Sequence, residues 1–139
     1  MPQSAEGGVD ANQNLVLCTP GPLFWRMYLR LSALLGFLGV ALGAFGAHGF
    51  HDVLVRNQRL DNWQTAVLYH LVHAAVLVAI ALQERMSRLA WWLFASGIVV
   101  FSGTLYALAI TNQKWLGAIT PIGGLALLGG WLTLALSRR

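Results

Sequence analysis

The sequence is poor in charge and in cysteine, and each shortage excludes a class of protein. Only 10% of its 139 residues are charged, whereas 57% are hydrophobic. A water-soluble chain of this size needs many more charges to cover its surface. The single cysteine, Cys18, excludes an intrachain disulfide and a cysteine-rich metal site. The net charge is +4, but the basic residues stand singly or in pairs and form no stripe, so nucleic acid is not an expected partner.

Four long runs of the sequence contain no charged residue. They are 20 to 25 residues long and cover 31–50, 62–83, 89–113 and 115–137. About 20 helical residues span the hydrocarbon core of a bilayer, and a backbone in lipid must satisfy its own polar groups. The fold class predicted is therefore an all-α integral membrane protein in contact with the lipid bilayer. Short connections make neighbouring helices antiparallel, giving an up-down bundle with helices at about 29–50, 62–83, 89–112 and 115–137.

The chain outside these runs predicts domain limits and orientation. Residues 1–26 are expected to form a flexible polar tail before a transmembrane domain at 27–139, because the segment is rich in Gly, Pro, Asn and Gln. Met27 directly precedes the first run and is an alternative start of the chain. Six arginines on the side of both termini, against three basic residues opposite, predict cytoplasmic termini in a bacterial inner membrane. In the loop at 51–61, a turn of interfacial helix is expected to turn Val53, Leu54 and Leu60 toward lipid.

Small residues and tryptophans suggest how the helices pack. Proline removes a backbone hydrogen bond, so Pro121 predicts a kink in the fourth helix. Small residues let helices approach closely in lipid, either within the bundle or between copies; the candidates are Gly36, Gly39, Gly43, Gly46, Gly123 and Gly124. Tryptophans near the run ends predict an aromatic belt at the membrane interfaces: Trp63, Trp91, Trp92, Trp115 and Trp131.

All four histidines occur in pairs three residues apart. His48 and His51 lie at the end of the first run, and His70 and His73 lie well inside the second. An ionisable residue at membrane depth is a candidate functional residue. Three interpretations stay open: a hydrogen-bonded structural seam, a proton or ligand path, and a haem or metal site. No cofactor is predicted; for haem or a transition metal, the candidate ligands would be His48, His70 and His73.

Hydroxyl groups on the third run are natural partners for these histidines. Ser102 and Tyr106 lie on one helical face at a spacing of four residues. No acidic residue is available to complete a hydrolase triad with Ser102. The candidate functional polar cluster therefore comprises His48, Tyr69, His70, His73, Ser102 and Tyr106.

Four stretches together resemble a known family. They are GAFGAHG (43–49), WQTAVLYHLVHA (63–74), VVFSGTLYAL (99–108) and ITPIGGLALLGGW (119–131). They are similar to the small bacterial inner-membrane proteins of the YgdD type, whose eukaryotic relatives include a small mitochondrial transmembrane protein. The resemblance covers about residues 28–137 and implies four transmembrane helices in a family without an assigned function. Its signature falls on Gly43, Gly46, His48, Trp63, Tyr69, His73, Ser102, Gly103, Tyr106, Pro121, Gly123 and Gly124.

The resemblance implies that His48 and His73 are the pair to examine. The function expected from the sequence is that of a non-enzymatic accessory or interaction component of a membrane complex. Its partners would be other membrane proteins or further copies of itself. A small transporter or channel-like protein with a histidine-containing interior is the first alternative, and a haem or metal-binding membrane protein is the second.

Overall fold

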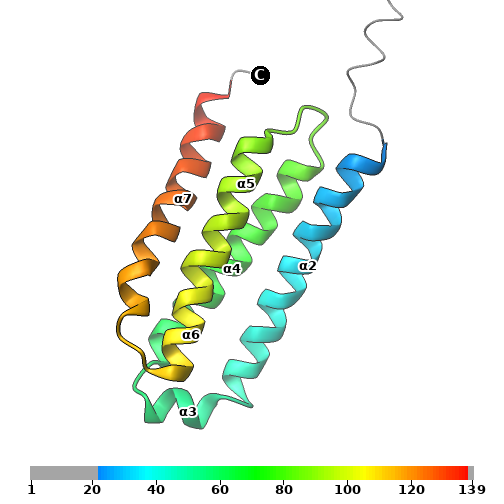
Figure 1. Ribbon diagram of the computed structural model, residues 1–139. Helices are drawn as coiled ribbons and strands as arrows, with labels where there is room; N and C mark the ends of the chain where they lie inside the picture. The colour runs from blue at the N-terminus through cyan, green and yellow to red at the C-terminus, as the bar shows by residue number, and fades with distance from the viewer. Residues whose placement is uncertain (1–21, 138–139) are drawn as a thin grey trace, which may run out of the picture.

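The computed structural model describes residues 22–137, which form four long helices and one short helix (Figure 1). The third long helix is continuous over Arg88–Thr111 and contains a π-helical turn. All four long helices are long and apolar enough to cross a membrane, which confirms the predicted all-α fold. The elements are α2 (Pro22–Ala47), α3 (His51–Arg56), α4 (Leu60–Ala81), α5 (Arg88–Gly97), the π turn η2 (Ile98–Ser102), α6 (Gly103–Thr111) and α7 (Leu116–Leu136).

The first long helix begins earlier than the sequence predicted. It starts at Pro22 rather than at about residue 29, so Met27 lies inside α2. Proline suits the first position of a helix, because its missing N–H would be unpaired there and its φ is already helical. None of the residues that follow it, LFWRMY, interrupts a helix. The rest of the predicted tail, residues 1–21, lies outside the described residues.

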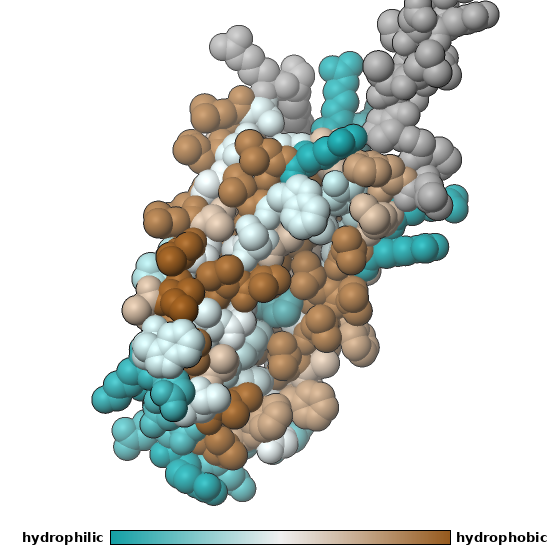
Figure 2. Space-filling model, in the orientation of Figure 1, coloured by the Kyte–Doolittle hydropathy of each residue, from teal (hydrophilic) through white to brown (hydrophobic). Residues whose placement is uncertain are grey.

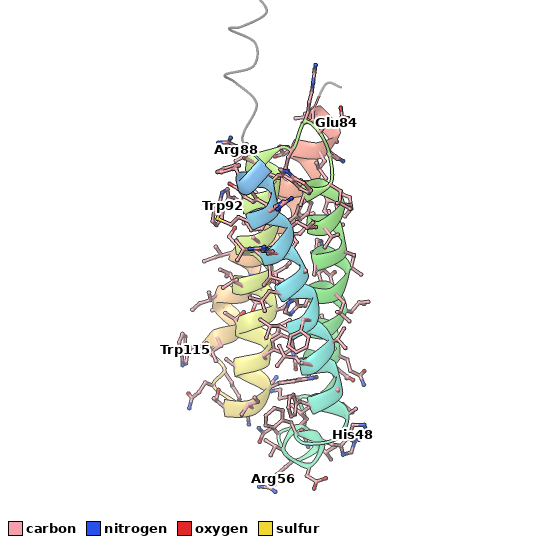
Figure 3. All side chains as sticks on the ribbon, turned by 90° about the vertical axis from the view of Figure 1, so that its right-hand side faces the viewer. His48, Arg56, Glu84, Arg88, Trp92 and Trp115 are labelled. Carbon is pink, nitrogen blue, oxygen red and sulfur yellow. The ribbon has the colours of Figure 1, made fainter. Side chains whose placement is uncertain are left out.

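Polar residues gather at the two ends of the molecule. Figure 2 shows hydrophobic residues across the middle of one face and hydrophilic residues toward its ends. The loop between α4 and α5 lies at the same end as the start of α2 and the end of α7 (Figure 1); we call this the loop end. The other end, called the α3 end, carries α3 and the turn between α6 and α7. In Figure 3, Glu84 and Arg88 lie at the loop end, and His48 and Arg56 lie at the α3 end.

The short helix α3 is anchored to the end of α6. The Asn57 side-chain amide donates hydrogen bonds of 2.9 Å to the carbonyls of Ala109 and Ile110. Asn112 ends α6 in the left-handed conformation, at φ 54°, which asparagine tolerates well. Leu54 is fully buried in the protein, so the expectation that it faces lipid was wrong. It packs in a cluster with Trp63 and other buried residues, because α3 folds under the bundle.

Glycines on α2 form the seam with α4. A Cβ atom at Gly43 would lie 3.3 Å from Val67, and one at Gly39 would lie 2.8 Å from Leu71. At Gly46 it would collide with the indole of Trp63. Each glycine therefore receives a larger side chain of α4, one helical turn after another. Of the four glycines on α2 that the sequence predicted for packing, only Gly36 has open space beside it.

A second glycine seam joins the third long helix to α7. A Cβ atom at Gly123 would collide with the backbone of Phe101 in η2, and one at Gly97 would collide with the side chain of Leu127. At Gly130 it would lie 2.8 Å from the ring of Phe94. Such close approach lets van der Waals contact hold helices together in lipid.

The two seams leave an open arrangement rather than a closed ring. The Cα atoms of α2 come within 8 Å of those of α3 and α4 only, among the described elements. Those of α7 come that close only to the segments of the third long helix. The helices α2 and α7 are therefore peripheral, and α4 and the third long helix are central (Figure 1). Few residues of either peripheral helix are buried within the protein.

Candidate functional site

A polar layer crosses the centre of the molecule between two apolar clusters. One cluster lies toward the loop end around Leu77 and Trp91, and the other lies toward the α3 end around Trp63 and Leu105. His70 and His73 fall between them on α4, with 5% and 6% of their surface exposed. They lie about 15 and 20 Å along the helix from its first residue, near the middle of a bilayer.

The imidazole of His73 has a defined proton. Its Nδ1 lies 2.7 Å from the carbonyl oxygen of Tyr69, and its Nε2 lies 3.2 Å from the indole nitrogen of Trp131. A carbonyl can only accept a hydrogen bond, so Nδ1–H donates to Tyr69. An indole N–H can only donate, so Nε2 accepts from Trp131. Both ring nitrogens of His73 are therefore engaged, one with the backbone of α4 and the other with α7.

The imidazole of His70 points to different helices and is less well bonded. Its Nδ1 lies 3.4 Å from the hydroxyl of Tyr106 on α6. Its Nε2 is buried and has no hydrogen-bond partner. A Cβ atom at Gly39 would touch this ring at 3.4 Å, and the backbone of Leu35 lies beside it. His70 is thus seated against α2 through the space that a glycine leaves.

Of the remaining residues of the predicted cluster, the two tyrosines each belong to one of these sites, and Ser102 bonds to neither histidine. The Ser102 hydroxyl is buried without a hydrogen-bond partner at the end of η2. Tyr106 belongs to the His70 site, where its ring also packs 4.7 Å from that of Trp63. Tyr69 belongs to the His73 site, where its ring stacks on the imidazole at 5.8 Å and packs at a tilt against Phe101 at 4.7 Å.

The structure does not bring His48 to the other members of the cluster. His48 lies in the turn after α2 and is exposed at the α3 end (Figure 3), far from the middle of α4. His51 is also exposed there and lies 3.7 Å from the Asp52 carboxylate. Within residues 22–137, no three His, Cys, Asp or Glu side chains come close enough to hold a metal ion together.

Three tryptophans make polar contacts that the sequence did not indicate. The indole of Trp63 donates to the carbonyl of Leu42 at 3.1 Å, and that of Trp91 donates to the hydroxyl of Ser32 at 3.0 Å. With Trp131, each links two long helices. Trp63 and Trp91 are only 2% exposed, so their assignment to an interfacial belt was wrong. The sequence signal that could have revealed these contacts is a glycine or serine on the helix across the seam. A glycine makes room for an indole, and a serine accepts a hydrogen bond from it.

Two grooves open on the membrane-facing surface, one on each side of α4. The first is between α2 and α4 toward the α3 end and has a volume of about 490 Å³. Its walls include Gly43, Ala47, Trp63 and Leu68. The second is between α4, η2 and α7, contains His73, and has a volume of about 510 Å³. We call these the α2 groove and the His73 groove.

These features define a multi-helix membrane protein whose interior polar groups serve helix contacts. Residues 42–124 match the family described as a protein of unknown function, DUF423. The UPF0382 membrane protein YwdK of Bacillus subtilis is 40% identical over 118 residues, which cover 81% of this chain and 95% of that protein. The chain belongs to this DUF423/UPF0382 family of membrane proteins, which confirms the resemblance inferred from its sequence.

The family extends beyond one bacterial group. A UPF0382 membrane protein of Haemophilus influenzae is 42% identical over 113 residues, covering 78% of this chain and 90% of that protein. The UPF0382 membrane protein C1782.12c of Schizosaccharomyces pombe is 36% identical over 112 residues, covering 76% and 95%. No solved structure matches the chain.

Proposed function

We propose that this protein is a non-enzymatic accessory component of a membrane complex, and that a transmembrane helix of another membrane protein docks in the α2 groove. The groove itself carries the proposal. Gly43, Gly46 and Ala47 line it on α2. The two glycines already receive Val67 and Trp63 of α4, so the exposed Ala47 is the small residue that a further helix can approach closely. The peripheral position of α2 adds support, because much of its apolar surface has no protein neighbour.

The chemistry of the interior supports a structural role. The acidic residues within 22–137, Asp52, Asp61 and Glu84, all lie outside the uncharged runs, so none of these described carboxylates stands beside the central histidines. Both nitrogens of His73 already bond within the protein. Catalysis by a histidine needs a nitrogen that can exchange a proton with substrate, whereas a helix contact needs only the bonds described.

Site-specific photo-crosslinking in living cells tests the docking. A benzophenone amino acid would replace Leu68, which lines the α2 groove and is 60% exposed. Leu132 on α7 is equally exposed at 60% and lines neither groove, so the same replacement there is the matched control. We expect one membrane protein, identified by mass spectrometry, to be joined to position 68 but not to position 132.

A groove-filling variant makes this test decisive. Ala47→Leu adds volume at an exposed position on the groove wall, and it should abolish the adduct at position 68. Adducts only between copies of this chain, or an unchanged adduct in Ala47→Leu, would contradict the proposal.

We propose further that the protein lies in the bacterial cytoplasmic membrane with both termini in the cytoplasm. Support comes from Arg26, Arg30, Arg85 and Arg88 at the loop end, against Arg56, Arg59 and Lys114 at the α3 end. Basic residues favour the cytoplasmic side. A fluorescent protein fused to the carboxyl terminus should therefore be active and an alkaline phosphatase fusion inactive; the reverse result would overturn this orientation.

A further inference from the structure

The His73 groove differs from the α2 groove in what its walls are made of. Aromatic rings from three elements line it: Tyr69 from α4, Phe101 from η2 and Trp131 from α7. Pro121 and Gly124 complete the α7 side together with three leucines. The rings of Tyr69 and Phe101 lie 4.7 Å apart and are tilted by 37°. The groove thus offers flat π surfaces, which favour a flat ring over a flexible chain.

Two of these aromatic residues are open to the membrane. Tyr69 is 42% exposed and Trp131 is 46% exposed. Tyrosine and tryptophan normally occupy the membrane interface, where their polar atoms meet water. Tyr69 instead lies about 13 Å along α4 from its first residue, near the middle of the hydrocarbon.

The hydroxyl of Tyr69 has no assigned use in the fold. It takes part in none of the side-chain hydrogen bonds that join the described helices, in contrast to the hydroxyl of Tyr106 and the indole of Trp131. A hydroxyl without a partner in hydrocarbon costs a few kcal/mol. An oxygen acceptor in the groove would remove this cost, and a hydrocarbon chain would not.

We propose that the His73 groove binds a lipid-soluble molecule with a flat ring that carries a hydrogen-bond-accepting oxygen, of the quinone class. The ring lies against Tyr69, Phe101 and Trp131, and the Tyr69 hydroxyl donates to the ring oxygen. The apolar tail of the molecule leaves through the open side into the bilayer.

The size of the groove agrees with this class of ligand. Pockets for small molecules have volumes of about 300–1,000 Å³ and combine mostly apolar walls with a few polar groups. At about 510 Å³, the groove is large enough for a substituted ring. The proposal is separate from the docking in the α2 groove, because the two grooves share no residue.

Binding of decylubiquinone to the purified protein in nanodiscs tests the proposal. The quinone quenches tryptophan fluorescence, so saturable quenching reports occupancy near Trp131. Tyr69→Phe keeps the ring and removes only the hydroxyl. We expect it to weaken binding about ten-fold, the loss of one buried hydrogen bond. Decylbenzene has the same tail and a ring without oxygen, and it should compete at least about ten-fold less well than the quinone.

A pair of glycine variants on α7 controls for folding. A Cβ atom at Gly124 would lie 3.7 Å from Phe101, and one at Gly129 would lie 3.7 Å from Leu93, so both positions accept a side chain. Only Gly124 lines the groove. Gly124→Leu should therefore abolish saturable quenching, and Gly129→Leu should retain it.

Three results would overturn the proposal. They are quenching that never saturates in the parent protein, equal competition by decylbenzene, and unchanged affinity in both Tyr69→Phe and Gly124→Leu. The second result would mean that the groove takes any apolar chain. None of them bears on crosslinking from position 68, so the two proposals fail separately.

Discussion

The two sides of α4 use histidine differently. On the side of α7, His73 makes two hydrogen bonds, of 2.7 and 3.2 Å, to groups whose chemistry fixes its proton. His70, which is seated against α2, makes one long contact of 3.4 Å, to Tyr106 on α6, and leaves Nε2 unpaired. Both side chains are about equally buried, so depth in the membrane does not explain the contrast.

The contrast comes from the seams behind each histidine. On the α7 side the backbones of Gly123 and Phe101 meet directly, and neither can rotate away. On the α2 side the glycines receive flexible side chains such as Leu71. A tightly packed seam therefore accompanies a satisfied histidine, and a more adaptable seam accompanies an unsatisfied one.

The largest expected effect comes from closing the α7 seam. Gly123→Ala would place a methyl group against the backbone of Phe101, which cannot rotate away. We expect a loss of about 3 kcal/mol in the free energy of unfolding, the upper range for overpacking. Gly124→Ala is the control, because its methyl group would meet the Phe101 ring at an ordinary 3.7 Å. Unfolding followed by circular dichroism in micelles compares the two, and equal stabilities would refute this account of the seam.

Replacing each histidine by leucine tests the comparison itself. His73→Leu leaves the Trp131 N–H without a partner in an apolar environment, at a cost of about 2 kcal/mol. His70→Leu removes a weak contact together with an unpaired nitrogen, so the stability should change by less than about 0.5 kcal/mol. The same unfolding experiment measures both. A larger loss for His70→Leu than for His73→Leu would reverse the assignment of roles.

The bond between Trp131 and His73 can be isolated by a double-mutant cycle. Trp131→Phe removes the indole N–H, and its effect should largely disappear when His73 is already leucine. Hydrogen bonds between transmembrane helices contribute about 1 kcal/mol, so we expect a coupling energy of that size. Additive effects would show that the two groups do not interact in the folded protein.

The smallest effect is expected at the long contact of His70. Tyr106→Phe removes the hydroxyl 3.4 Å from Nδ1, which is near the limit of a hydrogen bond. The stability should fall by less than about 0.5 kcal/mol, with no measurable coupling to His70→Leu. A coupling as large as that of Trp131 and His73 would show that the contact shortens in the bilayer.

Most of the fold follows from the sequence, because it depends on composition alone. Charge-free runs of 20 residues or more leave the backbone no stable alternative to helices. The glycine stripe of α2 also marked a real seam. The early start of α2 was missed, because the polar tail before it obscured a proline that suits a first helical turn.

The details of the site could not be predicted, because they depend on rotation of one helix against another. The spacing of His70 and His73 places them on adjoining faces, but only the packing of α2 and α7 decides which face meets which helix. The pairing of His48 with His73 required that the end of α2 reach the middle of α4, which the antiparallel seam prevents. The interfacial belt was predicted from the depth of the tryptophans in the membrane, whereas their indoles are positioned by gaps across the helix seams.

The π turn η2 determines which face the third long helix presents to its two neighbouring helices. Four buried residues recur at intervals of four: Phe94, Ile98, Ser102 and Tyr106. In a regular α-helix each such step overshoots a full turn by about 40°, so three steps would swing Tyr106 about 120° away from Phe94. The wider turn reduces this drift and keeps the row facing inward. Deleting one residue from 98–102 would restore a regular helix and still keep Tyr106 within about 20° of the face of Phe94, because eleven residues make about three full turns. A regular helix that kept every residue would instead carry Tyr106 away from His70.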